Sequence, residues 1–154
     1  MTIGQKKTAN LGPSGHEVWD IRCPTCQVAK VTYRNDQAVC SNCQSTYAHH
    51  DGVTYLTDLT QAPALNDFVK NYKIIRANQG YTGHNCAFYR DLPKYPKSGP
   101  EAGIWYIRQR SFAKLMQHLN RHHVSGAKIL DLGSGNGWLS HQLSQQKYSP
   151  CAVD

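Results

Sequence analysis

The hydrophobic pattern of the first third of the chain is that of short strands. Within residues 17–58, apolar residues recur at every second position between 29 and 33, and turn-forming residues follow at 35–36. This alternation predicts a β-strand, and a second short strand-like segment at 37–40, directly after the turn, predicts a β-hairpin. A second hairpin is predicted around the turn at 51–52. Because these strands are too short to enclose a large core, the block needs another source of stability.

The middle of the chain has helical periodicity. Between 64 and 79 one apolar stripe recurs at helical spacing, and its members are Leu65, Phe68, Val69, Tyr72 and Ile75. After an aperiodic stretch at 81–103, the helical pattern returns over 104–119 and ends near 125–126. We therefore expect two helices separated by a loop.

The last part of the chain has the order strand, turn, helix and strand. Residues 127–132 form a short apolar run, which is typical of a buried parallel strand. A glycine-containing turn follows, a helical pattern begins at Trp138, and a second apolar segment spans 150–154. This order is half of a nucleotide-binding unit, so the sequence predicts an α/β fold in which a small β block comes first.

Composition indicates a globular chain that does not span a membrane. The 154 residues are 40% hydrophobic and 18% charged, and no apolar run approaches the roughly 18–20 residues that cross a bilayer. Residues 1–17 lack the apolar core of a secretory signal. We therefore expect a cytoplasmic protein with no membrane partner, and we expect residues 1–16 to form a flexible leader.

The positive charge is concentrated in the middle of the chain. The formal net charge is +7, and residues 68–121 contain ten Lys and Arg residues against only Asp91 and Glu101. Such a segment suits RNA or another anionic partner, and a solvated helix surface explains it equally well.

Four of the six cysteines form two matched pairs. Two residues separate Cys23 from Cys26 and Cys40 from Cys43, and thirteen residues lie between the pairs. Zinc prefers four tetrahedral ligands and binds thiolates well, so two such pairs around a hairpin predict a Zn2+ site. Metal binding would supply the folding free energy that this short block lacks. Four cysteine ligands leave no open position, which makes the predicted site structural rather than catalytic.

Other interpretations of the cysteines and nearby histidines are weaker. Redox-active dithiols do not explain two matched pairs that flank a hairpin. His49 and His50 are near the second pair, but four sulfurs already complete the site, so we expect these histidines at an exposed hairpin tip. Cys86 is expected to be an ordinary thiol, and Cys151 a small residue of the core.

The cysteine block resembles a small zinc-ribbon family whose members activate several tRNA, rRNA and translation-factor methyltransferases. The resemblance covers residues 20–58 and rests on both cysteine pairs, on Tyr47 and on the turn at Asp51-Gly52-Val53. It implies a zinc ribbon, which we place at residues 17–60. A helical linker or cap region is then expected at 61–126.

The glycine-containing turn is suited to ligand binding. Its glycines allow a ligand to approach the backbone closely, and a helix N-terminus follows directly. A dinucleotide-binding turn that starts at Gly133 would place its third glycine at position 138, where this chain has Trp138. Asp131 would lie close to a pyrophosphate, so this acid suits a cationic ligand better.

The segment 129–139 resembles the S-adenosylmethionine-binding first motif of class I methyltransferases, in which an acid precedes alternating glycines. The resemblance implies a loop that holds the methionine part of S-adenosyl-L-methionine, and its residues are Gly133, Ser134, Gly135 and Gly137. It also implies that Asp131 helps to place the ammonium group, directly or through water, and that Asp154 holds the ribose hydroxyls. The helix at 105–112 resembles one that precedes the first strand in such enzymes; it either covers the cofactor or simply packs.

That family has a Rossmann-like sheet of seven strands with the first strand in the middle. Residues 127–154 suffice for two strands and a helix, so we expect a truncated S-adenosylmethionine-binding domain. The first strand would then keep one unpaired edge, and the chain alone would bind the cofactor weakly or not at all.

Two hypotheses on function follow. The first is an S-adenosylmethionine-dependent methyltransferase whose methyl acceptor is RNA, a small molecule or a protein. The second is a non-enzymatic zinc-ribbon module that binds RNA or a partner methyltransferase. A pure binding module has no need of the glycine turn, which therefore favours the first. The sequence assigns no catalytic residue and no oligomeric state.

Overall fold

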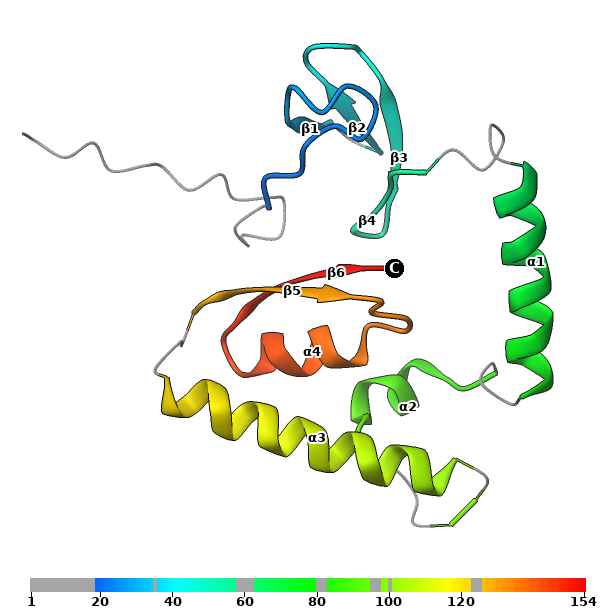
Figure 1. The fold of residues 1–154 in the computed structure, drawn as a ribbon, viewed down its shortest axis with the longest axis vertical. Coiled ribbons are helices and arrows are strands. Elements are labelled where there is room, and N and C mark those ends of the chain that lie inside the picture. The colour runs from blue at the N-terminus through cyan, green and yellow to red at the C-terminus, as the bar shows by residue number, and fades with distance from the viewer. Residues whose placement is uncertain are drawn as a thin grey trace, which may run out of the picture. The chain divides into compact units, whose positions relative to one another are not determined.

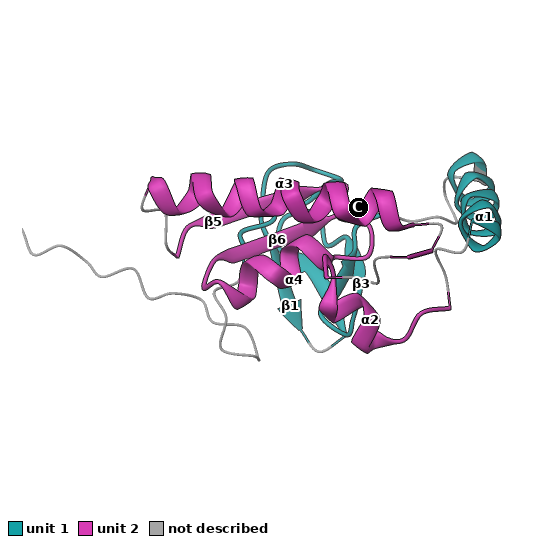
Figure 2. Cartoon of the chain, turned by 90° about the horizontal axis from the view of Figure 1, so that it is seen from below, with its two compact units in different colours: residues 1–80 teal, residues 81–154 magenta. Residues whose placement is uncertain are grey.

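The computed structural model describes residues 19–34, 36–57, 63–79, 83–94, 98–99, 101–122 and 126–154. The chain divides into two compact units, residues 1–80 and residues 81–154 (Figure 2). The boundary between the units lies inside the predicted helical segment 61–126. The leader predicted at 1–16 lies outside the described residues.

The first unit contains a small antiparallel sheet (Figure 1). Its strands follow one another in chain order: β1 (Val31–Arg34), β2 (Gln37–Cys40), β3 (Thr46–His50) and β4 (Val53–Tyr55). Both predicted hairpins are confirmed, since β1 pairs with β2 and β3 with β4. The second hairpin turns within two residues because Asp51 and Gly52 have φ of 51° and 79°, the left-handed pair that a type I′ turn requires.

One face of this sheet covers the cysteine block. Val31 and Ala38 are buried on it together with Cys23 and Cys40, and partly buried residues, including Tyr33 and Tyr47, pack around them. Cysteines therefore make up half of the buried cluster of this sheet, and little apolar side-chain volume remains to hold the strands together.

Helix α1 (Pro63–Asn78) follows the sheet in the sequence and confirms the first predicted helix. The rings of Phe68 and Tyr72 stack at 5.9 Å, and the guanidinium of Arg76 lies 5.8 Å from the Tyr72 ring. Neighbours on one face of α1 thus interact in the way that side chains four residues apart on a helix do.

The second unit combines helices with a two-stranded parallel sheet. Its elements in chain order are α2 (Cys86–Asp91), α3 (Ala102–Arg121), β5 (Lys128–Leu132), α4 (Trp138–Gln145) and β6 (Ser149–Val153). Leu130 of β5 lies opposite Cys151 of β6, and α4, which connects the two strands, lies against one face of the pair (Figure 1). The predicted order of strand, turn, helix and strand is confirmed. Among the helices that the structure describes, none is both long and apolar enough to cross a lipid bilayer.

Helix α2 lies in the stretch that the sequence pattern leaves aperiodic. It has only six residues, too few to repeat an apolar stripe. The side chain of Asn85 caps its start by accepting the Phe88 N–H at 2.9 Å. Near its end, the amide of Gln142 donates to the carbonyl oxygens of Arg90 and Leu92, at 3.0 and 2.6 Å. Polar bonds at its two ends therefore fix α2, and no periodicity in the sequence reveals it.

Aromatic rings join α3 to the start of α4. Trp105 is buried and meets the ring of Trp138 edge-on at 5.7 Å, and the ring of Phe112 lies 6.0 Å from Trp138. Edge-to-face pairs of this kind contribute about 0.5–1.5 kcal/mol beyond their buried area. The position of α3 is therefore explained by packing against the residue that follows the glycine turn.

The two faces of the β5–β6 pair differ in burial. On the side of α4, Leu143 is 0% exposed, whereas Leu132 of β5 is 71% exposed and Leu130 is 52% exposed. In the described residues β5 pairs with β6 alone, as expected for a strand with one open edge. Parallel sheets are normally covered on both faces, so this pair depends on the α4 side for its stability.

Matched alanine substitutions at Leu143 and Leu132 test this dependence. Leu143→Ala removes fully buried methyl groups, so we expect it to lower the free energy of unfolding of the second unit by about 2–5 kcal/mol. Leu132→Ala should change it by less than about 0.5 kcal/mol. Chemical denaturation followed by tryptophan fluorescence measures both changes, and equal losses would mean that the open face is covered in solution.

Candidate metal centre and glycine loop

The two cysteine pairs have the same backbone geometry, and we call the turns Cys23–Gln27 and Cys40–Gln44 the first and second knuckle. The N–H of Gln27 donates to the carbonyl oxygen of Cys23 at 2.9 Å, and the N–H of Gln44 to that of Cys40 at 3.1 Å. Both glutamines have left-handed φ angles, 57° and 60°. Such a conformation is unfavourable for a residue with a side chain, so its repetition indicates that closure of each knuckle requires it.

A second backbone bond closes each knuckle at its base. The N–H of Cys23 donates to the carbonyl oxygen of Ala29, and the N–H of Cys40 to that of Ser45, both at 2.9 Å. The first knuckle precedes β1 and the second joins β2 to β3, so the β1–β2 hairpin brings the two turns together.

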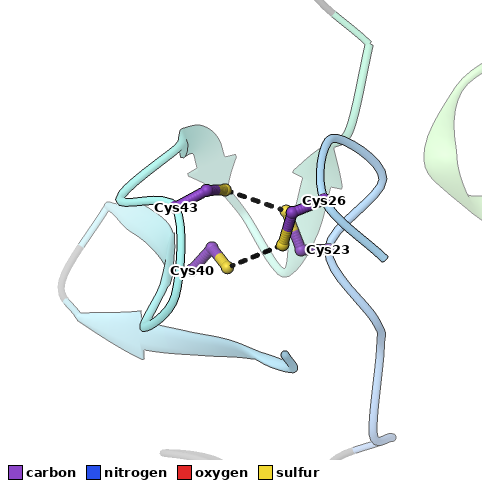
Figure 3. A group of neighbouring side chains, drawn as sticks. All are labelled: Cys23, Cys26, Cys40 and Cys43. Atoms are coloured by element: carbon purple, nitrogen blue, oxygen red, sulfur yellow. Dashed lines mark hydrogen bonds between the residues drawn. The ribbon is translucent and has the colours of Figure 1, made fainter. Parts of the chain in front are cut away.

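The four sulfur atoms meet in one cluster (Figure 3). All four lie within 4.8 Å of one another, and the Cys23–Cys43 and Cys26–Cys40 Sγ pairs are each 3.6 Å apart. Zinc with four sulfurs at about 2.3 Å requires separations of about 3.8 Å along the edges of the tetrahedron. None of the four is in a disulfide. The donor set fits the metal, and the four-cysteine cluster could bind Zn2+.

The electrostatics of the cluster favour a cation among the sulfurs. Burial raises the pKa of Cys23, but hydrogen bonds from Tyr47, the Cys26 backbone and neighbouring thiols outweigh it and lower the pKa to about 6. The N–H groups of Val28 and Ala29 lower the pKa of Cys26. Backbone N–H groups also favour the Cys40 thiolate, yet burial and the adjacent thiols dominate and raise its pKa to about 11. Without a metal the cluster therefore resists holding four thiolates, and a divalent cation removes that obstacle.

Two hydroxyl groups contact the sulfurs, and the cysteine spacing predicts neither contact. The Tyr47 hydroxyl lies 3.1 Å from Sγ of Cys23 and 2.8 Å from Oγ1 of Thr25. The Ser45 hydroxyl lies 3.1 Å from Sγ of Cys43. The resemblance singled out Tyr47 only as an aromatic residue after the last cysteine, whereas here its polar end reaches the cluster.

His49, His50, Cys86 and Cys151 lie outside this cluster, and His49 is half-buried rather than exposed as expected. His49 is on β3, where its ring meets Tyr33 at 5.0 Å and Nδ1 lies 3.0 Å from the Thr54 hydroxyl. His50 is exposed at the end of the same strand. Cys86 is exposed at the start of α2, and Cys151 is half-buried on β6, where burial raises the pKa of its thiol. In the part of the chain that the structure describes, the four-cysteine cluster is the one grouping of potential metal ligands with three or more members.

The glycine loop joins β5 to α4 and owes its course to backbone conformation. Gly133, Gly135 and Gly137 all have left-handed φ, at 70°, 55° and 72°. A Cβ atom added at any of them would meet no atom within 4 Å. The glycines are therefore required for their φ angles, and the space beside them is open.

Both predicted acids lie at the carboxyl ends of the parallel strands, next to this loop. Asp131 is half-buried and accepts the Ser140 hydroxyl at 2.8 Å. Asp154 follows β6 and accepts the N–H of Gly135 at 3.1 Å. The N–H groups of Gly133 and Ser134 donate to the carbonyl oxygen of Val153, at 2.7 and 3.1 Å. The structure thus brings together the loop and the two acids that the sequence singles out.

Metal analysis tests the cysteine cluster. Purified protein should contain about one zinc per chain, and replacement of Cys23 and Cys40 by Ser should abolish it, because each knuckle then keeps a single thiolate. Cys86→Ser is the matched control, since that exposed thiol lies outside the cluster and its loss should leave the zinc content unchanged. A wild-type chain that is folded and free of metal would contradict the assignment.

Comparison with protein-family models, with curated proteins and with solved structures finds no match to this chain. What is established about the first unit therefore comes from its own geometry. A four-cysteine cluster on a small antiparallel sheet, with two knuckles of the same shape, is a zinc-ribbon-like module.

Proposed function

We propose that residues 127–154 belong to the S-adenosylmethionine-binding domain of a methyltransferase whose N-terminal module is zinc-ribbon-like. One observation carries the proposal: a left-handed glycine loop at the carboxyl edge of a parallel strand pair, with a carboxylate at the end of each strand. Ligands of open α/β sheets bind at this edge, outside the carboxyl ends of the strands.

The charge at this edge favours a cationic ligand. Asp131 and Asp154 flank the loop, and no Lys or Arg occurs between residues 129 and 146. S-adenosylmethionine brings a sulfonium and an ammonium group, which two carboxylates attract. A dinucleotide brings two phosphate charges, which Asp131 beside the loop would repel.

The hydrogen bonds of the loop also argue against a phosphate site. A phosphate-binding loop directs unpaired backbone N–H groups at its ligand. Here the N–H groups of Gly133, Ser134, Gly135 and Gly137 already donate within the protein; their acceptors are Val153, Asp154 and Ser134. An anion would have to displace these bonds, whereas a cation attracted to the carboxylates would not.

Each acid has a separate task in the proposed site. Asp131 would attract the ammonium group of the donor while it keeps the Ser140 hydroxyl as a partner. A carboxylate has two oxygens, so Asp154 can hold the Gly135 N–H with one and accept ribose hydroxyls with the other. These residues bind and orient the donor, and orientation is the main contribution that enzymes make to a transfer of this kind.

Ligand titration distinguishes the proposed donor from a dinucleotide. S-adenosylmethionine, titrated to millimolar concentration, should shift the backbone amide resonances of residues 131–140 and 154, and NADH should not. Asp131→Asn should weaken binding on the order of tenfold through the loss of one charged contact. Asp91→Asn, at the exposed end of α2, is the matched control. The proposal fails if NADH shifts these resonances and S-adenosylmethionine leaves them in place.

Helix α3 favours a second candidate function, the binding of RNA by a non-enzymatic zinc-ribbon module. The helix carries Arg108, Arg110, Lys114 and Arg121 and contains no Asp or Glu from Ala102 to Arg121. Arg110, Lys114 and Arg121 share one face at helical spacing. A face of one sign attracts a polyanion, and the counterions of the polyanion are released on binding. The same surface also suits an RNA acceptor of the methyltransferase, so RNA binding is compatible with either function.

Salt dependence tests the role of α3 in RNA binding. If three phosphates contact this face of the helix, the logarithm of the binding constant for single-stranded RNA should fall with the logarithm of salt concentration at a slope of about −2. Arg110→Gln combined with Lys114→Gln should flatten this slope, and Lys147→Gln, beyond α4, should not. Binding that salt does not weaken, or no binding at all, would remove RNA as a partner of this helix.

A further inference from the structure

The Tyr47 hydroxyl occupies a junction between the first knuckle and β3. It lies 3.1 Å from Sγ of Cys23 and 2.8 Å from Oγ1 of Thr25, both in the first knuckle. Tyr47 itself comes from β3, twenty-four residues after Cys23. One oxygen atom therefore joins a strand of the sheet to a metal-ligating turn that precedes the sheet in the chain.

The direction of these two hydrogen bonds follows from the chemistry of a loaded site. A thiolate bound to zinc has no proton, so it can only accept. Tyr47 must then donate its single O–H to Sγ of Cys23, and the proton between Tyr47 and Thr25 must come from the threonine. The result is a relay in which Thr25 donates to Tyr47 and Tyr47 donates to Cys23.

The two knuckles differ in the donors that reach their sulfurs. Cys23 and Cys43, whose sulfurs are 3.6 Å apart, each receive a side-chain hydroxyl, from Tyr47 and from Ser45. Ser45 is only two residues from Cys43, so its hydrogen bond is local and does not join separate elements. The Tyr47 bond, in contrast, ties Cys23 to a strand beyond both knuckles.

We propose that Tyr47 is a positioning residue of the metal centre, which fixes the Cys23 sulfur for zinc and is itself oriented by Thr25. Donors to a coordinating atom fix its orientation and withdraw part of its charge, and their loss typically costs 10–100-fold in metal affinity. The inference rests on the cluster holding zinc. It does not depend on the methyl donor, because no residue of the glycine loop enters it.

Tyr47→Phe tests the inference because it removes the hydroxyl and keeps the ring. Zinc affinity is measured by competition with a chromophoric chelator, together with the rate of zinc release and the amide spectrum of the loaded protein. We expect a 10–100-fold loss of affinity with a preserved spectrum. Tyr33→Phe is the matched control, because the Tyr33 ring lies on the same sheet face and contacts His49. The zinc affinity of this variant should stay within about twofold of wild type.

Thr25→Val provides a second variant that does not disturb the core, since this threonine is exposed. In the wild-type background, Thr25→Val should lower the zinc affinity by about two- to tenfold. In the Tyr47→Phe background it should have no further effect, because the relay is already broken. Wild-type affinity in Tyr47→Phe, an equal loss in Tyr33→Phe, or an undiminished Thr25→Val effect in the double variant would each overturn the inference. A folded wild type without zinc would remove the site itself, and the inference with it.

Discussion

The first unit depends on four sulfur atoms that the backbone holds within 4.8 Å of one another. Apart from the cysteines, the buried cluster of its sheet contains only Val31 and Ala38. Full burial of a valine contributes about 1.5–3 kcal/mol, which is far too little to order four strands. A structural zinc ion contributes about 10–16 kcal/mol in comparable small domains. A bound zinc ion would also offset the cost of the two left-handed glutamines.

The second unit is stabilised in a different way. Its parallel pair is covered by α4 on one face, and α4 is in turn held by the rings of Trp105 and Phe112 and by the bonds of Gln142 to the end of α2. The glycine loop closes on the end of β6 through bonds to Val153 and Asp154. Because these bonds are made within the protein, the loop has its course before any ligand arrives. A preformed loop lowers the ordering cost that a ligand must overcome.

Local patterns in the sequence predict much of this architecture, and contacts between distant residues account for what they miss. The cysteine spacing predicts the ligands because a knuckle is complete within five residues. Period-two alternation and the turn at Asp51-Gly52 predict the hairpins for the same reason. Helix α2 is missed because it is less than two turns long and depends on Gln142, some fifty residues away. The Tyr47 contact is missed because alternation along a strand predicts the face on which a side chain lies. It does not predict the hydrogen-bond partner of that side chain's hydroxyl.

The glycine loop illustrates a finer limit of sequence reasoning. The three glycines indicate left-handed backbone, but the pattern alone leaves open whether the loop N–H groups face a ligand or the protein itself. The structure directs them inward, to the end of β6 and to Asp154. That detail weighs against a phosphate ligand, and spacing alone does not contain it.

The second unit carries acidic groups beside the glycine loop and basic groups on α3, and both bear on the proposed function. The loop edge carries Asp131 and Asp154, whereas α3 carries four cations and no acid. Arg108 lies 4.6 Å from the ring of Trp105, which packs on Trp138 directly after Gly137, and it is on a different face of α3 from the other three cations. A methyl donor is cationic and RNA is anionic, so charge of each sign in this unit is compatible with the proposed pair of ligands. A module that only binds RNA would account for the basic helix and would use Asp131 and Asp154 only to hold Ser140 and the loop, whereas the proposed methyltransferase would also use them to bind its donor.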